Sequence, residues 1–246
     1  MKFRIIQCLL LVGLFLPFSL ASAGETQKPL NVCILSGCNT YNSEESLPPF
    51  QDFLEKNYNV KCVRLIRQAT DDLPGLEQLD DCDVAFVFIK RMQLKGEQLE
   101  RFKKYATSGK PIVAVRTASH AVQTWLEFDK EVLGGNYHSH HPVGPVTQTA
   151  VTPEAKNHPI LAGVEIPSAS DALYKNEGHS PDIQVLLTGT IPGQPTEALA
   201  WTRNYKGGRI FYTSLGAQDT FKLPAFRRML ANALFWTSGR EVELKK

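Results

Sequence analysis

The sequence has 246 residues, which is enough for one large domain with a substantial hydrophobic core. It carries 27 basic and 25 acidic residues, and this balance argues against nucleic acid or an anionic surface as the main partner. The cysteines form no CxxC pair, which argues against a structural zinc knot.

The first 23 residues have the pattern of a signal peptide. Lys2 and Arg4 precede an apolar run over 5–20, and Ala21-Ser22-Ala23 supplies small residues at the cleavage site. Cleavage would remove two of the 27 basic residues and leave 25, equal to the 25 acidic ones. We therefore expect a signal peptide over 1–23, one domain over 24–246, and a secreted or periplasmic protein. A retained N-terminal anchor is the alternative.

The first half of the mature chain alternates between predicted strands and helices. Short apolar runs predict buried strands at 29–37, 59–66, 83–89 and 111–115. Helical spacing of apolar residues predicts helices at 46–58 and 95–109. This alternation predicts an α/β fold with an open, mostly parallel sheet and helices on both faces. Ligands of such sheets bind beyond the carboxyl ends of the strands, which selects the loops 36–46, 90–94 and 116–120.

The second half has a looser pattern. Further strands are predicted at 144–151, 183–190, 197–203 and 207–216, and a closing helix at 223–239. No repeat or interdomain linker interrupts it. Cys38 and Cys82 lie near strand ends and are the better disulfide candidates, although the sequence leaves their pairing open.

The segment "PIVAVRTASH" has the layout of a nucleophile elbow, a strand followed at once by a tight turn and a helix. Hydrolases place Ser or Cys at the turn, but here Arg116 occupies it, and a guanidinium is not a nucleophile. A guanidinium beside a helix N-terminus favours an oxygen-rich or anionic ligand. The alternative is that Arg116 pairs with a structural carboxylate. His120, in the first turn of the expected helix, is a candidate proton carrier or a structural residue.

The segment "LGGNYHSHHPVGP" holds three of the six histidines. On an extended segment His138 and His140 point the same way, and His141 points the other way. Two imidazoles on one face are potential ligands of a divalent metal such as zinc, together with a carboxylate or a third histidine. Alternatively, one of them is a general acid or base, or the loop is simply polar and solvated.

The chain resembles the trehalose-utilisation (ThuA-like) family, whose fold is similar to class I glutamine amidotransferases. The resemblance spans nearly the whole mature chain, and its closest match is to exported members with "RTASHA" at the elbow. It is carried by the order of "GCNTYNSEESL", "PIVAVRTASHA", "VLGGNYHSHHP", "NHPILAGV", "DALYKN", "ALAWTRNYKGGRIFYTSLGAQD" and "NALFWTSG". Three positions depart from the family pattern. Arg116 replaces a histidine at the elbow, Ala172 an acidic residue and Ala217 another histidine.

The resemblance implies a polar pocket above the sheet and a role in the catabolism of sugars, especially oxidised (keto) disaccharides. Its catalytic candidates are His120, Arg116, His140 and Glu44. The ligand-binding candidates are Tyr41, Ser43, Tyr137, Tyr174, Gln218 and Asp219, and the metal candidates are His138 and His140.

Three functions follow from these residues. The first is proton transfer, of isomerase, lyase or hydrolase type, on a sugar or keto-sugar, with Arg116 at an oxygen and His120 or His140 moving a proton. The second is non-catalytic carbohydrate binding by a degenerate site. The third, an amidase or glutaminase, needs Cys38 or Ser119 as the nucleophile. The expected partner is a small carbohydrate, without nucleic acid and without membrane after signal cleavage. Substrate, metal and homo-oligomer formation stay open.

Overall fold

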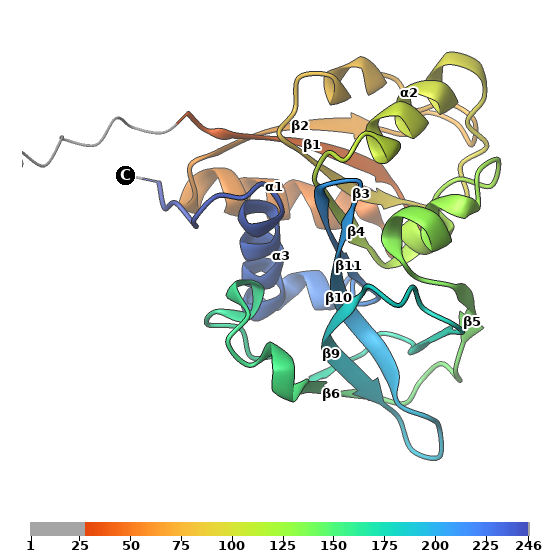
Figure 1. Cartoon of the computed structure of the whole chain (residues 1–246), viewed down its shortest axis with the longest axis vertical. Coiled ribbons are helices and arrows are strands. Elements are labelled where there is room, and N and C mark those ends of the chain that lie inside the picture. The colour runs from red at the N-terminus through yellow and green to blue at the C-terminus, as the bar shows by residue number, and fades with distance from the viewer. Residues whose placement is uncertain (1–27, 246) are drawn as a thin grey trace, which may run out of the picture.

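The computed structural model describes residues 28–245, so the predicted signal peptide lies outside the described residues. Nine strands form one open sheet in the order β2-β1-β3-β4-β11-β10-β9-β6-β7 (Figure 1). In chain order these strands are β1 (Leu30–Gly37), β2 (Val60–Ile66), β3 (Val84–Ile89), β4 (Ile112–Val115), β6 (Thr147–Val151), β7 (Ser168–Ala169), β9 (Gln184–Thr190), β10 (Glu197–Tyr205) and β11 (Gly208–Thr213).

The sheet has a parallel half and an antiparallel half. Strands β2, β1, β3, β4 and β11 are parallel to one another, as expected for strands joined through helical crossovers. β10 pairs antiparallel with β11, and β9, β6 and β7 continue in the antiparallel sense. The carboxyl ends of β1, β3, β4 and β11 meet at one edge, where the loops selected by the sequence come together.

Helices cover both faces of the sheet, which confirms the predicted α/β class. α1 (Ser43–Asn57) and α3 (Pro224–Thr237) pack on one face, and α2 (Gly96–Thr107) packs on the other (Figure 1). Alternate residues of a strand serve the two layers: Val113 faces the α1–α3 layer, and Ala114 faces the α2 layer. No helix among residues 28–245 is long and apolar enough to cross a membrane.

Two features near the elbow differ from the sequence-based expectation. The segment after β4 is a five-residue 3-10 helix, Arg116–His120, and not the start of an α-helix. The next helical segment, Phe128–Leu133, is a π-helix, a rare form that occurs often at functional sites. In addition, β5 (Tyr137–His140) pairs with β8 (Tyr174–Asn176) in a small second sheet. This pairing brings the histidine loop next to "DALY".

Candidate functional site

The elbow predicted at the end of β4 is present in the backbone. Arg116 follows β4 directly and has a φ of 48°, in the left-handed region that non-glycine residues rarely adopt. Its carbonyl oxygen accepts a hydrogen bond from the Tyr212 hydroxyl at 2.8 Å. Gly216 lies against the turn, because a Cβ there would come within 2.5 Å of Val115 Cγ1. The neighbouring strand end therefore holds the turn in place.

The Arg116 side chain forms an internal ion pair. Its Nη1 lies 3.0 Å from Asp171 Oδ1, and both side chains are 1% exposed. Nη1 also donates to the Ser214 carbonyl at 2.5 Å, and Nη2 donates to the Tyr41 hydroxyl at 2.9 Å. Only Nε is without a partner among the described residues, and it is sealed from solvent. The geometry therefore favours the structural alternative for Arg116 over direct contact with a ligand oxygen.

Asp171, in "DALY", is the buried partner of Arg116 that the sequence analysis did not predict. Its Oδ1 accepts the backbone N–H groups of Gly216 and Ala217 at 2.8 and 2.7 Å, and its Oδ2 accepts the Thr220 hydroxyl. The carboxylate thus joins the elbow to the loop after β11. A buried carboxylate with this many donors is fully compensated.

Aromatic rings enclose the guanidinium. Tyr41 and Tyr174 lie with their ring centroids 4.2 and 4.7 Å from Arg116 Cζ, a cation–π arrangement. Tyr137 packs on Tyr174 with centroids 4.5 Å apart, and His120 stacks on Tyr137 at 4.7 Å. The structure thus brings together the predicted residues Arg116, His120, Tyr41, Tyr137 and Tyr174.

His120 is a buried, uncharged imidazole. Burial, together with the nearby cations Arg91, Lys90 and Arg116, lowers its pKa to about 3. Its Nδ1 lies 3.1 Å from Ser119 Oγ, whereas Nε2 has no hydrogen-bond partner among residues 28–245. The imidazole therefore keeps one nitrogen free for a ligand at neutral pH.

A cavity of about 290 Å³ opens beside this imidazole. We call it the His120–Asp129 pocket; its polar lining includes Ser119, His120, Asp129, Asn136 and Tyr137. Asp129 is 5% exposed, and burial raises its pKa to about 7, partly opposed by a hydrogen bond from the Tyr137 backbone N–H. Perturbed titratable groups that converge on one cavity mark a functional-site candidate. The sequence reasoning did not select Asp129 or Asn136.

In the histidine loop, His141 lies on the opposite side from His138 and His140, as the alternation predicted. His141 is buried between Gln194 Oε1 and Glu197 Oε1, each 2.8 Å from a ring nitrogen. His138 and His140 are exposed, and His138 Nε2 lies 3.9 Å from Glu177 Oε2. Residues 28–245 contain no group of three or more His, Cys, Asp or Glu side chains suited to a metal ion. The proposed pair of metal ligands thus has no third partner in this arrangement.

The remaining predicted site residues lie apart from the His120–Asp129 pocket. Glu44 is exposed and lines a separate hollow beside α1, and no ion pair or hydrogen bond joins it to His120 or His140 in the described chain. Ser43 is buried and accepts the Cys38 backbone N–H at 2.8 Å, so it has a structural role. Gln218 donates to Glu45, and Asp219 pairs with Lys222 at the surface.

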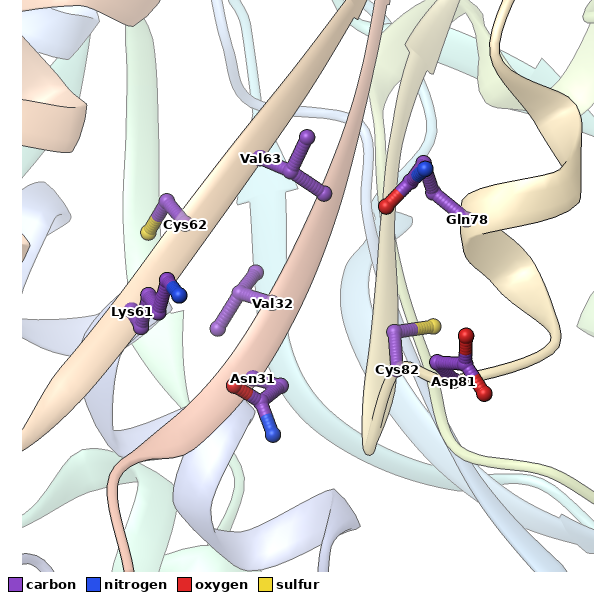
Figure 2. Close-up of a pocket in the computed structure, with 8 residues that line it drawn as sticks. All are labelled: Asn31, Val32, Lys61, Cys62, Val63, Gln78, Asp81 and Cys82. Atoms are coloured by element: carbon purple, nitrogen blue, oxygen red, sulfur yellow. The ribbon is translucent and has the colours of Figure 1, made fainter.

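Another hollow, of about 210 Å³, lies at the opposite edge of the sheet, near the amino ends of β1 and β2. Figure 2 shows that Cys62 and Cys82 lie on either side of β1 there. All four cysteines of residues 28–245 are free thiols. The expectation that Cys38 or Cys82 takes part in a disulfide is therefore wrong; Cys82 Sγ donates to the Leu79 carbonyl at 3.7 Å instead. The hollow contains no group comparable to His120 or Asp129.

The sequence and the fold were then compared with known proteins. The model of the trehalose-utilisation family, ThuA, matches residues 31–237. No curated protein matches the sequence. A ThuA-like protein from Parabacteroides merdae is similar in structure, with a TM-score of 0.68 and 18% identity over 87% of this chain and 91% of that chain. A ThuA-like protein from Bacteroides uniformis gives 0.65 and 19%, over 88% and 94%.

A cold-adapted β-galactosidase from Rahnella also contains a similar fold. Its TM-score is 0.56 at 12% identity, over 84% of this chain and 30% of that chain. At these identities the structural likenesses concern the fold alone, and the family model carries the assignment. Because the model spans nearly all of the described residues, the chain belongs to the trehalose-utilisation family, ThuA.

Proposed function

We propose that this protein acts in carbohydrate utilisation by transferring a proton to or from a sugar or keto-sugar bound in the His120–Asp129 pocket. Membership of the ThuA family supports the carbohydrate class. The observation that carries the proposal is the cavity beside the elbow, in which two buried titratable side chains, His120 and Asp129, line one wall together with neutral polar groups.

The lining suits a neutral polyhydroxylated ligand. Asn136 and Ser119 offer an amide and a hydroxyl, which both donate and accept hydrogen bonds, and the Tyr137 ring offers a flat apolar face. Leu126, 56% exposed, adds an apolar rim. A volume of about 290 Å³ is at the lower end of the usual range of ligand pockets, about 300–1,000 Å³, which favours a ligand part of the size of one sugar ring.

His120 is placed to act on a carbonyl oxygen. Ser119 Oγ has one hydrogen and two acceptors within reach, His120 Nδ1 at 3.1 Å and the Arg116 carbonyl oxygen at 3.3 Å. In the tautomer that we propose, Ser119 donates to Nδ1, so the neutral imidazole carries its hydrogen on Nε2 and can donate it to the ligand. A pKa of about 3 makes this imidazole a weak base but a stable neutral donor at physiological pH. Arg116 supports the pocket indirectly, because its guanidinium holds Tyr41 and Tyr174, and Tyr174 packs on Tyr137.

Solvent deuterium reports such proton transfer directly. A disaccharide carrying one ring ketone is incubated in D₂O with the mature protein, residues 24–246, and its mass is followed. We expect deuterium to enter at the carbon beside the ketone faster than in a blank without protein. His120→Ala should slow this by at least about 100-fold, whereas His158→Gln, a histidine outside the pocket, should not. Incorporation at the blank rate by the wild type would refute the proposal.

Non-catalytic carbohydrate binding is the second candidate, favoured by the Arg116–Asp171 pair that fills the elbow. It predicts saturable binding of the keto-disaccharide without deuterium incorporation. The amidase alternative has less support, because Cys38 is fully buried and burial raises its thiol pKa. Export to the periplasm or the medium remains part of the proposal, and N-terminal sequencing of the exported protein, with Gly24 expected first, tests it.

A further inference from the structure

Asp129 is a buried carboxyl group within the proposed site. It stands on the π-helix Phe128–Leu133, is 5% exposed, and lines the same cavity as His120. Acidic side chains are seldom this buried unless they are paired or bind a ligand. No ion pair joins Asp129 to a cation within residues 28–245.

One oxygen of this carboxyl group is left without a partner. Oδ2 accepts the Tyr137 backbone N–H at 2.8 Å, whereas Oδ1 is sealed and has no hydrogen bond among the described residues. Gly135 makes room for it: a Cβ at that position would lie 2.4 Å from Oδ1. The glycine of "VLGGNY" thus lets the backbone approach the carboxyl group closely. A buried acceptor left unpaired lowers stability, a cost that is common where the group has a function.

The groups that face Asp129 do not neutralise it. His120, on the 3-10 helix, is uncharged, and Tyr212, on β11, is a phenol whose own pKa is raised mainly by burial. Glu127 and Lys130, on either side of Asp129, line the same pocket with opposite charges. Lys103, on α2, lies over the Trp125 ring and forms no ion pair with Asp129. Burial therefore dominates, and the pKa of about 7 leaves both forms of the carboxyl group populated at neutral pH.

From this geometry we infer that Asp129 is the catalytic residue that exchanges a proton with the ligand, while His120 Nε2 binds the ligand oxygen. The inference rests on the function proposed above and names the acid–base group of that site. The ligand class is a sugar with a ketone, or a carbonyl formed on ring opening, and a hydrogen on the adjacent carbon.

The step needs no further reactant. Asp129 Oδ2, which keeps a lone pair besides the one that accepts the Tyr137 N–H, takes the proton from the carbon beside the carbonyl, and the C–H electron pair becomes the new C=C bond. The carbonyl π pair moves to the oxygen, which His120 Nε2–H stabilises. Return of the proton to the same carbon restores the ketone. Where that carbon bears a hydroxyl, return of the proton to the former carbonyl carbon isomerises the ligand: the hydroxyl becomes the new carbonyl and its proton passes to the original oxygen. In D₂O the proton held by Asp129 exchanges with solvent, so the returned atom is deuterium.

The test compares deuterium incorporation into the keto-disaccharide by wild type, Asp129→Asn and Gly135→Ala. The first variant removes the titrating group, and the second keeps the carboxyl group but displaces it. Asp80→Asn, an exposed carboxylate paired with Arg101, is the matched control. We expect a loss of at least about 100-fold for both pocket variants and wild-type incorporation for Asp80→Asn. The wild-type rate should also change with pH, with a midpoint near 7.

The outcomes separate the two proposals. If the wild type incorporates deuterium and folded Asp129→Asn matches it, the inference is overturned and the proposed function stands. If the wild type itself incorporates none, both are overturned. If Asp129→Asn does not fold, Gly135→Ala and the wild-type pH profile decide, and a rate independent of pH from 5 to 9 counts against Asp129.

Discussion

Arg116 and Asp171 form an ion pair inside the protein at the position where an α/β hydrolase carries its nucleophile. The pair joins the turn after β4 to "DALY", and Asp171 in turn binds the backbone after β11. The backbone of Arg116 has the left-handed conformation of an elbow. Its guanidinium is directed into the protein, where it pairs with Asp171. The guanidinium is therefore not available to a ligand, and the chemistry that we propose lies in the neighbouring His120–Asp129 pocket.

Removing the carboxylate should destabilise the protein strongly. Asp171→Ala leaves the Arg116 guanidinium buried without its counter-charge and leaves two backbone N–H groups unpaired. We expect a loss of about 3–5 kcal/mol in the free energy of unfolding, the usual result of breaking a buried pair. Urea unfolding monitored by tryptophan fluorescence measures it.

Asp80→Asn is the matched control for this prediction. It breaks an ion pair with Arg101 in which Asp80 is 54% exposed, so the expected loss is below about 1 kcal/mol. Equal losses for Asp171→Ala and Asp80→Asn would show that the buried pair contributes no more than a surface one.

Most of the fold could be predicted from the sequence, because its buried strands are continuous apolar runs. β3, for example, is buried at every position and was predicted from its continuous apolar letters. The β5–β8 pairing was missed because "YHSH" is polar and exposed, and its partner "YKN" is only three residues long. A short polar strand forms because a neighbouring strand is available to pair with it. The local sequence pattern contains no information about that neighbouring strand.

The site was predictable only in part for a similar reason. His120 and Tyr137 stood out because they flank recognisable turns. Asp129 lies in "LEFDKEVL", where an acidic residue among charges indicates a solvated face, yet tertiary packing buries it. Asp171 was not predicted, because the family pattern places an acidic residue at the next position, where this sequence has Ala172. The glycine pair 134–135 is the one signal in the sequence, because glycine lets the backbone approach a neighbouring group closely.

Three of the cysteines should be unreactive in the folded protein. Cys33 and Cys38 are fully buried, and burial raises the pKa of Cys62 to about 12, so little thiolate is present there. We expect iodoacetamide at pH 8 to label none of these three appreciably within an hour, and all four cysteines of the described chain in guanidinium, as counted by mass spectrometry. Rapid labelling of native Cys38 would revive the amidase alternative.

Zinc should bind weakly at the histidine loop. His138 and His140 are exposed and have no third ligating group among the described residues, whereas stable zinc sites use at least three protein ligands. Elemental analysis of untagged protein should therefore give well below one zinc per chain, unchanged in His138→Ala. Near-stoichiometric zinc that is lost in His138→Ala would establish the metal site instead.

His120 should make the protein less stable in acid. Its folded-state pKa of about 3 lies below the ordinary value of 6.5, so the unfolded chain binds the extra proton first. The stabilising effect of keeping it neutral is complete above pH 6.5 and is lost as the pH falls towards 3. His120→Gln should lack this loss. Between pH 7 and 4 the wild type should lose about 2–3 kcal/mol relative to the variant in urea unfolding.

Asp129 should have the opposite effect on the pH dependence of stability: it should make the protein less stable as the pH rises. Its folded-state pKa of about 7 lies above the ordinary value of 3.8, so the folded protein binds the proton more tightly. Stability from this group is complete below pH 3.8 and is lost as the pH rises through 7, where the buried carboxylate becomes charged. Asp129→Asn carries no such charge. Relative to wild type it should therefore gain about 2–4 kcal/mol between pH 4 and pH 8.5.

The same series of urea unfolding curves, recorded from pH 4 to 8.5, measures this gain. Asp80→Asn, in which the lost carboxylate is exposed, should show no comparable change with pH. A stability difference between Asp129→Asn and wild type that stays constant over this range would mean that Asp129 is already ionised at pH 4. The carboxylate would then be a base of ordinary strength, and the midpoint near pH 7 expected for deuterium incorporation would be absent.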